Sequence, residues 1–308
     1  MIIAQECWFL TGPTASGKTA VAVSLAREIG AEIVSMDSMA LYRGMDIGTA
    51  KPTQAEREAV PHHLIDVTEP SESYSVARYR DEALAAAERI QARGREVLFV
   101  GGTPLYLKAL LRGLFEGPEA DWELRRSLEA DAASGQLDLH AELAQFDPVA
   151  AERLHANDTR RLIRAIEVYR LTGTPISQLQ REFERAHPAQ ATRVFELQWP
   201  RHELNRRIDS RVETMFAAGL VAEVQALLAD RARLSRTARQ ALGYREVIAH
   251  LEGRYTWDET VELMKTHTRQ FARRQLTWFR SLPECRPVTC TAGIRAEEVG
   301  SLIRSMVA

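Results

Sequence analysis

The chain has 308 residues, a formal net charge of −2, and 45% hydrophobic and 27% charged residues, the composition of an ordinary globular protein. No apolar run approaches the roughly 20 residues of a membrane span, and three cysteines in no paired pattern indicate a reduced, cytoplasmic protein with no membrane partner. The charge is uneven, because residues 151–280 hold 23 basic and 16 acidic side chains while the remainder is acidic. A basic segment on an otherwise acidic chain favours a polyanionic partner.

Strand and helix patterns alternate over the first part of the chain. Buried strands are predicted by apolar runs at 6–11, 31–36, 62–67 and 95–100. Helices are predicted at 17–30, at 75–93 with Ser75 as N-cap, and from 104 onward. This alternation indicates a parallel sheet with right-handed crossovers, and therefore an α/β fold. In such a sheet the loops 11–18, 37–51 and 101–104 converge at the carboxyl ends of the strands.

The pattern becomes helical throughout from about residue 119, with breaks near Gly135, Pro148, Asn157 and Gly173. We interpret this stretch as an all-helical insertion domain. A strand returns at 191–199, and helices follow, including a long one near 256–281. The predicted organisation is a first core segment at 1–118, the helical insertion at 119–190, and a second core segment at 191–308 that carries basic helices.

The most specific single motif is GPTASGKT, which lies between a predicted strand and a predicted helix and fits the phosphate-binding loop pattern. Its backbone N–H groups would point at anionic oxygens, helped by the positive end of the helix dipole. Lys18 adds a point charge, and the Thr19 hydroxyl suits Mg²⁺ as a ligand. The predicted cradle consists of Gly12, Pro13, Thr14, Ala15, Ser16, Gly17, Lys18 and Thr19.

Two further side chains are expected beside this loop. P-loop triphosphatases usually end an apolar strand with a Mg²⁺-binding Asp, but here the strand EVLFV ends in GGTPLY, which places the Thr103 hydroxyl near the phosphate site. Asp37 closes the second strand at the same sheet edge, where a carboxylate can act as a general base or orient a nucleophile. The alternative for Asp37 is a cap of the turn DSMALY. Asp66, after HHLI, is a weak substitute for the Mg²⁺-binding Asp. The missing Asp counts against phosphoryl transfer without excluding it.

Arginines cluster at four places in the basic segment: 153–170, 201–211, 231–245 and 267–280. In the last cluster, Arg273, Arg274 and Arg280 interleave with Trp278 and Phe279. Arginines beside aromatic rings suit phosphate contacts combined with base stacking. One cluster alone would be an ordinary solvated helix face, but four together predict a nucleic-acid partner.

The motifs GPTASGKTAVAVSLA, SMDSMALYRGMDIGTAKP, VPHHLIDV, VGGTPLYLKALLRG, NDTRRLIRAIEVYRLTG, RIDSRVETMFAAGLVAEV, ALGYREV and RQFARRQLTWFR occur in this order from about residue 8 to 280. In this combination the chain resembles the bacterial tRNA dimethylallyltransferase family. The resemblance implies a P-loop kinase-like core with a helical insertion, a monomer, and transfer of a dimethylallyl group from dimethylallyl pyrophosphate. The acceptor it implies is N6 of the adenosine 3′ of the anticodon, in tRNAs reading codons that start with U. In such enzymes the phosphate loop holds a pyrophosphate leaving group rather than ATP.

The resemblance also implies roles for single residues. Asp37 would be the general base, and Thr103 would hydrogen-bond the leaving pyrophosphate. Arg211, with Lys18 and Mg²⁺, would stabilise the developing negative charge, and Arg207 is the less favoured candidate for that role. The positions that match the family's tRNA contacts are Asp37, Ser38, Met39, Ala40, Thr103, Arg125, Arg160, Arg161, Leu162, Ile163, Arg164, Arg239, Gly243, Tyr244, Arg245, Arg273, Arg274, Gln275, Trp278 and Arg280.

Three other functions stay open from the residues alone. A small-molecule P-loop kinase would use the same cradle for ATP, but it leaves the basic segment unexplained. A prenyltransferase acting on free adenine nucleotides would need neither the insertion nor the arginine clusters. A non-catalytic nucleic-acid binder would bind tRNA in a salt-dependent manner without forming product.

Overall fold

The structure is a computed structural model, and it describes residues 6–114, 117–186, 193–229 and 234–307. The chain divides into two compact units, one formed by Met1–Leu111 with Ala189–Ala308 and the other by Arg112–Pro188. The sequence placed the corresponding boundaries at 118/119 and 190/191, and the second of these lies outside the described residues.

The first unit is built on a six-stranded sheet in which all neighbouring strands are parallel. The strands are β1 (Trp8–Thr11), β2 (Ala31–Ser35), β3 (His62–His63), β4 (Glu96–Gly101), β5 (Val194–Gln198) and β6 (Arg286–Thr289), in the order β3-β2-β4-β1-β5-β6. Strands β1 and β2 are buried over their whole length, as expected for a parallel sheet covered on both faces. The predicted α/β fold is confirmed.

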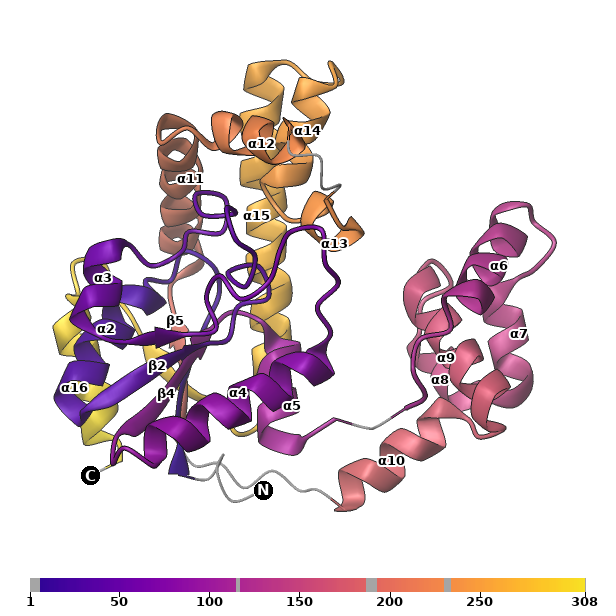
Figure 1. Ribbon diagram of the computed structural model, residues 1–308, viewed down its shortest axis with the longest axis horizontal. Coiled ribbons are helices and arrows are strands. Elements are labelled where there is room, and N and C mark those ends of the chain that lie inside the picture. Colours follow the sequence, from indigo (N-terminus) through magenta and orange to yellow (C-terminus); the bar gives the residue numbers. More distant parts are fainter. Residues whose placement is uncertain (1–5, 115–116, 187–192, 230–233, 308) are drawn as a thin grey trace. The chain divides into compact units, whose positions relative to one another are not determined.

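Helices cover both faces of this sheet (Figure 1). Helices α2 (Lys18–Ile29) and α16 (Ala296–Ser305) pack on the face that carries Leu10 and Leu98. Helices α4 (Val76–Gln91) and α5 (Pro104–Arg112) pack on the face that carries Phe9 and Phe99. Successive strand residues point to opposite faces, so β1, β2, β4 and β5 each contribute to both cores. Helix α4 begins as predicted, with the Ser75 hydroxyl accepting the N–H of Arg78 at 3.1 Å.

One predicted strand is much shorter than expected. The sequence predicts a strand at 62–67, but β3 contains only His62 and His63. Leu64 and Asp66 both have φ of 58°, a left-handed conformation that ends an extended strand. The N–H groups of Asp66 and Val67 instead donate to the carbonyls of Ala40 and Leu41. The segment after β3 therefore supports the loop that follows Asp37.

The first unit contains further helices beyond those that flank the sheet. They are α3 (Gln54–Ala59), α11 (Arg201–Ala217), α12 (Leu220–Ala229), α13 (Arg236–Arg239), α14 (Tyr244–Leu251) and α15 (Trp257–Arg280). A separate core joins side chains of α11, α12, α14 and α15 to Tyr42 and Met45 of the loop after β2. Within the described residues no single helix is long and apolar enough to cross a membrane; the bent pair α11 and α12 meets that length and composition test only when taken together.

The second unit is the helical insertion. It contains α6 (Trp122–Ala133), α7 (Leu139–Phe146), α8 (Pro148–Arg153), α9 (Thr159–Thr172) and α10 (Ile176–Ala186), and no strand lies in the described part of this unit. Asp121, Asp138 and Asp147 each accept backbone hydrogen bonds at the start of a helix, which explains where α6, α7 and α8 begin. The core centres on Leu128, Leu143 and Ile166, all fully buried.

Candidate active site

The loop between β1 and α2 has the backbone of an anion cradle. Gly12, Ala15 and Gly17 have φ of 147°, 61° and 87°. A Cβ on Gly12 would lie 3.0 Å from the carbonyl oxygen of Leu197, so only glycine fits there. Ala15 is a residue with a side chain held in the left-handed region, a costly conformation that concentrates at ligand sites. The loop leads into the N-terminus of α2. Two of its N–H groups, those of Thr14 and Ser16, donate within the protein, and contact of the others with an anion stays a prediction.

Lys18 is folded back over this loop. Its Nζ donates hydrogen bonds to the carbonyls of Gly12 at 2.9 Å and Pro13 at 2.8 Å. Burial, and secondly the charge of Arg211, lower the pKa of Lys18 to about 7, while Asp37 acts in the opposite direction. A bound anion would restore the charged form of the lysine, so the side chain is poised to respond to a phosphate ligand.

The Ser16 hydroxyl is an unsatisfied polar group inside the cradle. Its Oγ is buried and has no hydrogen-bond partner among the described residues. The Ser16 carbonyl, by contrast, accepts the indole N–H of Trp199 at 2.9 Å, which ties the loop to the segment after β5. Buried polar atoms without partners are rare in native structures, and here the orphan lies where an oxygen-rich ligand is expected.

Asp37 and Thr103 meet at the neighbouring strand ends, as the sequence predicts. Asp37 Oδ1 accepts the N–H groups of Met39 at 2.8 Å and Ala40 at 3.4 Å, so the turn-capping role is real. Its second oxygen has no hydrogen bond to any described residue and stays available for chemistry. Thr103 Oγ1 accepts the N–H of Ser38 at 3.0 Å, which fixes the threonine hydroxyl beside the Asp37 turn.

A small pocket lies against the cradle and Asp37. Lys18, Thr19 and Asp37 line it together with apolar side chains that include Ala22, Ile33, Ala40, Ile65 and Val100. Its volume of 70 Å³ gives room for roughly five to seven water-sized groups. The pocket therefore places a cation, a hydroxyl and a carboxylate around a partly apolar space.

The two glycines after β4 allow three chain segments to approach closely. A Cβ on Gly101 would lie 2.0 Å from the carbonyl oxygen of Met36, and one on Gly102 would lie 2.6 Å from Gln275 Nε2. Gln275 is 3% exposed, and its amide bridges Thr14 N–H at 2.8 Å and the Gly102 carbonyl at 2.6 Å. Gln275 was predicted as a tRNA contact, but the structure uses its amide to join the cradle to the turn after β4.

Arg207 and Arg211 project from α11 toward the cradle, and their surroundings differ. Arg207 donates to the Ala15 carbonyl at 2.8 Å and stacks on Trp199 with its guanidinium 4.3 Å from the ring centroid. Arg211 makes a single long hydrogen bond, 3.5 Å, to the Thr14 hydroxyl. Burial and the charge of Arg207 lower the pKa of Arg211, and Asp37 raises it. Arg207 is committed to the loop, whereas Arg211 is the arginine free to contact a ligand.

Both arginines also line a large cleft of 1180 Å³, which shares Ala50, Lys51 and Pro52 with the small pocket. Its walls come from α11, from the start of α3 and from the loop at 46–53, and it includes the basic side chains of Arg57 and Arg206. This cleft reaches the phosphate loop at Ala15. The positive charge around the cradle is therefore supplied by α11, which the sequence marked by the RIDSR motif.

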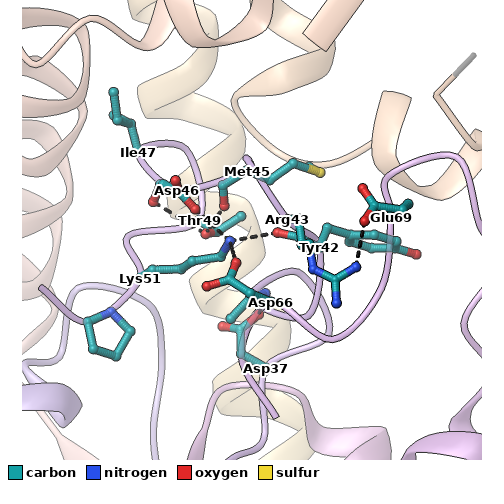
Figure 2. Close-up of polar contacts among 12 residues, drawn as sticks. Asp37, Tyr42, Arg43, Met45, Asp46, Ile47, Thr49, Lys51, Asp66 and Glu69 are labelled. Atoms are coloured by element: carbon teal, nitrogen blue, oxygen red, sulfur yellow. Dashed lines mark hydrogen bonds and ion pairs between the residues drawn. The ribbon is translucent and has the colours of Figure 1, made fainter. Parts of the chain in front are cut away.

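The loop after Asp37 is held by Lys51, a residue that the sequence did not single out (Figure 2). The side chain of Lys51 is 2% exposed, and its Nζ donates to the Tyr42 carbonyl and to Asp46 at 2.6 Å each, and to Asp66 at 2.5 Å. Burial raises the pKa of Asp66, but hydrogen bonds from Lys51 and Arg57 outweigh it and leave that pKa below its usual range. The only sequence signal is that Lys51 is one of four lysines among 40 basic residues.

Glu223 on α12 also stabilises this loop through hydrogen bonds. Its carboxylate accepts the N–H groups of Asp46 and Ile47 at 3.0 and 2.7 Å and the Tyr244 hydroxyl at 2.6 Å. Gly48 lies so close to the Tyr244 ring that a Cβ would approach Cε2 to 2.4 Å. Tyr244, predicted as a tRNA contact, is fully buried where α12 and α14 meet the loop after Asp37.

The other predicted tRNA positions separate into exposed and buried sets. Exposed or partly exposed side chains are those of Ser38, Met39, Arg125, Arg160, Arg161, Arg164, Arg239, Arg245, Arg273, Arg274, Trp278 and Arg280. Buried positions are Ala40, Leu162, Ile163 and Gly243, and Leu162 and Ile163 belong to the core of the insertion. At 160–164 the accessible side chains are therefore those of the arginines that flank these two apolar residues.

No group of three or more His, Cys, Asp or Glu side chains that could hold a metal exists within the described residues. A Mg²⁺ ion usually takes only one or two protein ligands and completes its shell with water and phosphate oxygens. The Thr19 hydroxyl beside the cradle fits that sparse type of site, and a full protein cage is not required.

Comparisons with known proteins agree with this geometry. A model of the IPP transferase family matches residues 40–282. A tRNA dimethylallyltransferase of Pelotomaculum thermopropionicum is 47% identical over 278 residues, which covers 90% of this chain and 88% of that protein. A tRNA dimethylallyltransferase of Rhodopirellula baltica is 45% identical over 307 residues, covering 97% and 92%.

Solved structures give the same result. The full-length tRNA isopentenylpyrophosphate transferase of Bacillus halodurans has a TM-score of 0.73 at 38% identity and covers 98% of this chain and 96% of that one. A eukaryotic dimethylallyltransferase acting on tRNA has a TM-score of 0.77 at 27% identity, with coverage of 93% and 74%. The resemblance read from the motifs is confirmed, and the chain belongs to the IPP transferase family together with these tRNA dimethylallyltransferases.

Proposed function

We propose that the chain transfers the dimethylallyl group of dimethylallyl pyrophosphate to N6 of the adenosine 3′ of the anticodon, in tRNAs that read codons starting with U, and releases pyrophosphate. The observation that carries the proposal is the pocket in which Lys18, Thr19 and Asp37 surround one space. A phosphate cradle, a carboxylate and an apolar wall are the three features this reaction needs together.

Each part of the donor substrate has a counterpart in the site. The pyrophosphate would lie in the cradle against Lys18 and the loop N–H groups, with the Ser16 hydroxyl gaining a partner. The five-carbon group would occupy the apolar side of the pocket, against Ile33 and Val100. The reacting carbon would then lie between the cradle and Asp37.

In the transfer, the N6 amine attacks the first carbon of the dimethylallyl group. A carbon–nitrogen bond forms, the bond from that carbon to the pyrophosphate oxygen breaks, and its electron pair leaves with pyrophosphate. The amine is a weak nucleophile because its lone pair is delocalised into the adenine ring, so Asp37 Oδ2 accepts its proton as the bond forms. Lys18, Arg211 and the Thr103 hydroxyl stabilise the charge that develops on the leaving group.

A Mg²⁺ ion held by the Thr19 hydroxyl and by pyrophosphate oxygens would neutralise part of that charge. The acceptor adenosine must leave its stack to reach Asp37, which costs a few kcal/mol. Arg273, Arg274 and Arg280 of α15 are exposed and would bind the RNA backbone and offset that cost. A monomeric state and a cytoplasmic location stay predictions.

The test combines the protein with dimethylallyl pyrophosphate, Mg²⁺ and an unmodified tRNA that reads U-starting codons, followed by digestion and nucleoside mass spectrometry. The proposal predicts N6-dimethylallyladenosine at the position after the anticodon. Parallel reactions with AMP, and with ATP in place of the prenyl donor, distinguish the rival functions. The proposal would be contradicted if AMP were prenylated while the tRNA stayed unmodified, or if phosphate were transferred from ATP.

A further inference from the structure

The helical insertion presents one large aromatic side chain to solvent at the start of α6. Trp122 is 59% exposed, more than any other large apolar side chain in the described residues. It occupies the first position of the helix, directly after the N-cap Asp121. The rings of Phe146 and Tyr169 in the same unit stack with their centroids 3.9 Å apart. Trp122 stacks on no aromatic ring in the described part of the insertion. An indole in this position is not needed for the core.

Arg125 lies one turn further along α6 and packs over the Trp122 ring, with the guanidinium carbon 5.0 Å from the ring centroid. Glu167 on α9 holds the guanidinium in this position. Nε and Nη2 of Arg125 each donate a 2.8 Å hydrogen bond to the two carboxylate oxygens of Glu167. Such a bidentate pair fixes the plane of the arginine as well as its position.

Glu167 organises more than one arginine. It is fully buried and also accepts hydrogen bonds from Arg164 Nη1 at 2.5 Å and from the Asp121 N–H at 2.8 Å. Arg164 is fixed further by a 3.0 Å hydrogen bond to the Pro118 carbonyl. Burial raises the pKa of Glu167, but the hydrogen bonds from Arg125 and Arg164 outweigh it, so the carboxylate is charged. Two arginines share one buried carboxylate, which orders both guanidinium groups, while Asp121 and Glu123 flank the indole in the sequence and offset their charge.

The insertion is not basic overall, but several of its arginines lie on α6 and α9. Residues 112–188 contain 10 arginines and 14 acidic residues, so the insertion as a whole is acidic. Around Trp122, however, the fold gathers Arg125 and Arg164, with Arg160 and Arg161 at the start of α9 on the same helix as Arg164. A large exposed ring beside ordered guanidinium groups is the combination that binds unpaired bases, because the ring stacks and the cations contact phosphates.

We propose that Trp122 and Arg125 form a stacking platform for one unpaired base of the RNA that the helical insertion binds. This inference rests on the proposed function only in taking tRNA as the substrate, and it adds the side chain that stacks on the base. Glu167 is the positioning residue of the platform, since it holds the guanidinium of Arg125 in the orientation that covers one side of the indole. The other side of the indole is open to a base.

The experiment measures binding of a fluorescent anticodon stem-loop RNA to the full chain by anisotropy. Trp122→Ala should weaken binding by about 5- to 150-fold, the effect of losing one stacked base. Trp122→Phe, which keeps an aromatic face, should retain most of the affinity. The matched control is Trp257→Ala in the first unit, because Trp257 is another exposed tryptophan, at 48%. The affinity of this variant for the stem-loop should equal that of the wild type.

A second measurement identifies the stacked base. A set of stem-loops, each lacking one loop base, is bound by the wild type and by Trp122→Ala. The penalty of Trp122→Ala should vanish on one of these RNAs and persist on the others. A penalty that is absent on the intact stem-loop, or that persists on every abasic RNA, would overturn the platform.

Two controls separate the possible failures. A duplex with the same stem and no loop should bind the wild type and Trp122→Ala equally, and an equal loss on duplex and stem-loop would contradict stacking. Nucleoside mass spectrometry on the wild type tests the proposed function independently. An active enzyme with an unaffected Trp122→Ala variant would remove the platform and keep the function. Trp122→Gln, which keeps a long side chain at this exposed position, replaces Trp122→Ala if that variant melts at a lower temperature than the wild type.

Discussion

Gln275 Oε1 accepts the backbone N–H of Thr14 at 2.8 Å, although the two residues lie 261 positions apart. Through this bond the long helix α15 holds the first turn of the phosphate cradle. The N–H of Thr14 is thereby used within the protein, as is that of Ser16, which donates to the Pro13 carbonyl at 3.3 Å. The other N–H groups at 15–19 remain for the ligand. Because the exposed faces of α15 carry Arg273 and Arg274, the segment proposed to bind RNA and the segment proposed to bind pyrophosphate are joined by one buried amide.

The first prediction removes this amide. Gln275→Ala leaves Thr14 N–H and the Gly102 carbonyl without partners, so pyrophosphate should bind about 10-fold more weakly and the free energy of unfolding should fall by roughly 2 kcal/mol. Calorimetry and urea unfolding measure the two effects. The control is Thr277→Ala on the same helix, whose exposed hydroxyl bonds only the carbonyl of Arg273. Equal pyrophosphate affinity in both variants would refute the role of Gln275.

The second prediction concerns the proton on Lys18. Its pKa of about 7 in the free protein should rise when an anion enters the cradle, so pyrophosphate binding at about pH 8 should take up close to one proton at this residue. Titration calorimetry in two buffers of different ionisation enthalpy measures the uptake. Lys18→Arg stays charged throughout and corrects for the protons taken up by pyrophosphate itself. An identical uptake by Lys18→Arg and the wild type would contradict the prediction.

The same lowered pKa fixes the sign of a stability effect. Between about pH 7 and pH 10.4 the unfolded chain binds more protons at this lysine than the folded chain, so the stability of the ligand-free protein should rise with pH in that window. Lys18→Met should flatten this part of the stability profile. A profile with the same slope in both proteins would assign the pH dependence to other groups.

The third prediction tests Lys51 as the clamp of the loop after Asp37. Lys51→Met removes three hydrogen bonds from a lysine whose side chain is 2% exposed, and we expect a loss of about 2 kcal/mol in the free energy of unfolding, discounted because Asp46 and Asp66 are partly solvated. Lys265→Met is the control, because that lysine also pairs with two carboxylates, but both are about two-thirds exposed. Its loss should stay under about 1 kcal/mol. Equal losses in urea unfolding would show that burial of Lys51 contributes nothing.

Lys51 also affects stability at low pH. The pKa of Asp66 is lowered in the folded protein, so this carboxylate stabilises the fold above about pH 4 and the contribution disappears as the pH falls through the folded pKa. The stability difference between the wild type and Lys51→Met should therefore shrink in acid. A difference that is constant from neutral pH into acid would contradict the assigned pairing.

The fourth prediction uses the close approach at Gly101. A Cβ there would lie 2.0 Å from the backbone oxygen of Met36, and since backbone cannot move aside as a flexible side chain can, Gly101→Ala should cost roughly 3 kcal/mol or prevent folding. Gly94→Ala is the control, because Gly94 has a φ of 69° and no atom within 4 Å of the added carbon. It should cost about 1 kcal/mol. Similar thermal stabilities for the two variants would mean that β4 and the Asp37 turn separate easily.

The features of the site that the sequence predicted are those written in local patterns. The cradle at 12–19 follows from two glycines and a lysine between a strand and a helix, and Asp37 and Thr103 follow from their places at strand ends. Parallel strands bring such ends to one edge, and in the structure Asp37 lines one pocket with Lys18 and Thr19. The capping alternative for Asp37 is correct, because Oδ1 accepts the N–H groups of Met39 and Ala40, while its role as general base stays a prediction.

The features that the sequence did not predict depend on contacts between distant segments. Gln275, Glu223 and Trp199 reach the site loops across 261, 176 and 183 residues, and no periodic pattern marks such pairs. The predicted strand at 62–67 was too long for a related reason. Its apolar residues suit a strand, but the backbone hydrogen bonds of Asp66 and Val67 are taken by the loop at 40–41.

The central claim is that Asp37 receives the proton of the acceptor amine while the cradle holds the leaving pyrophosphate. Asp37→Asn tests it most directly, because the amide oxygen can still accept the N–H groups of Met39 and Ala40 and keep the turn intact. The measurement is the single-turnover rate of N6-prenylation with enzyme in excess over tRNA, together with the dissociation constants of pyrophosphate and of the tRNA. The account predicts a rate about 10²- to 10⁴-fold lower with both dissociation constants within about twofold of the wild type. A prenylation rate in Asp37→Asn equal to that of the wild type would contradict it.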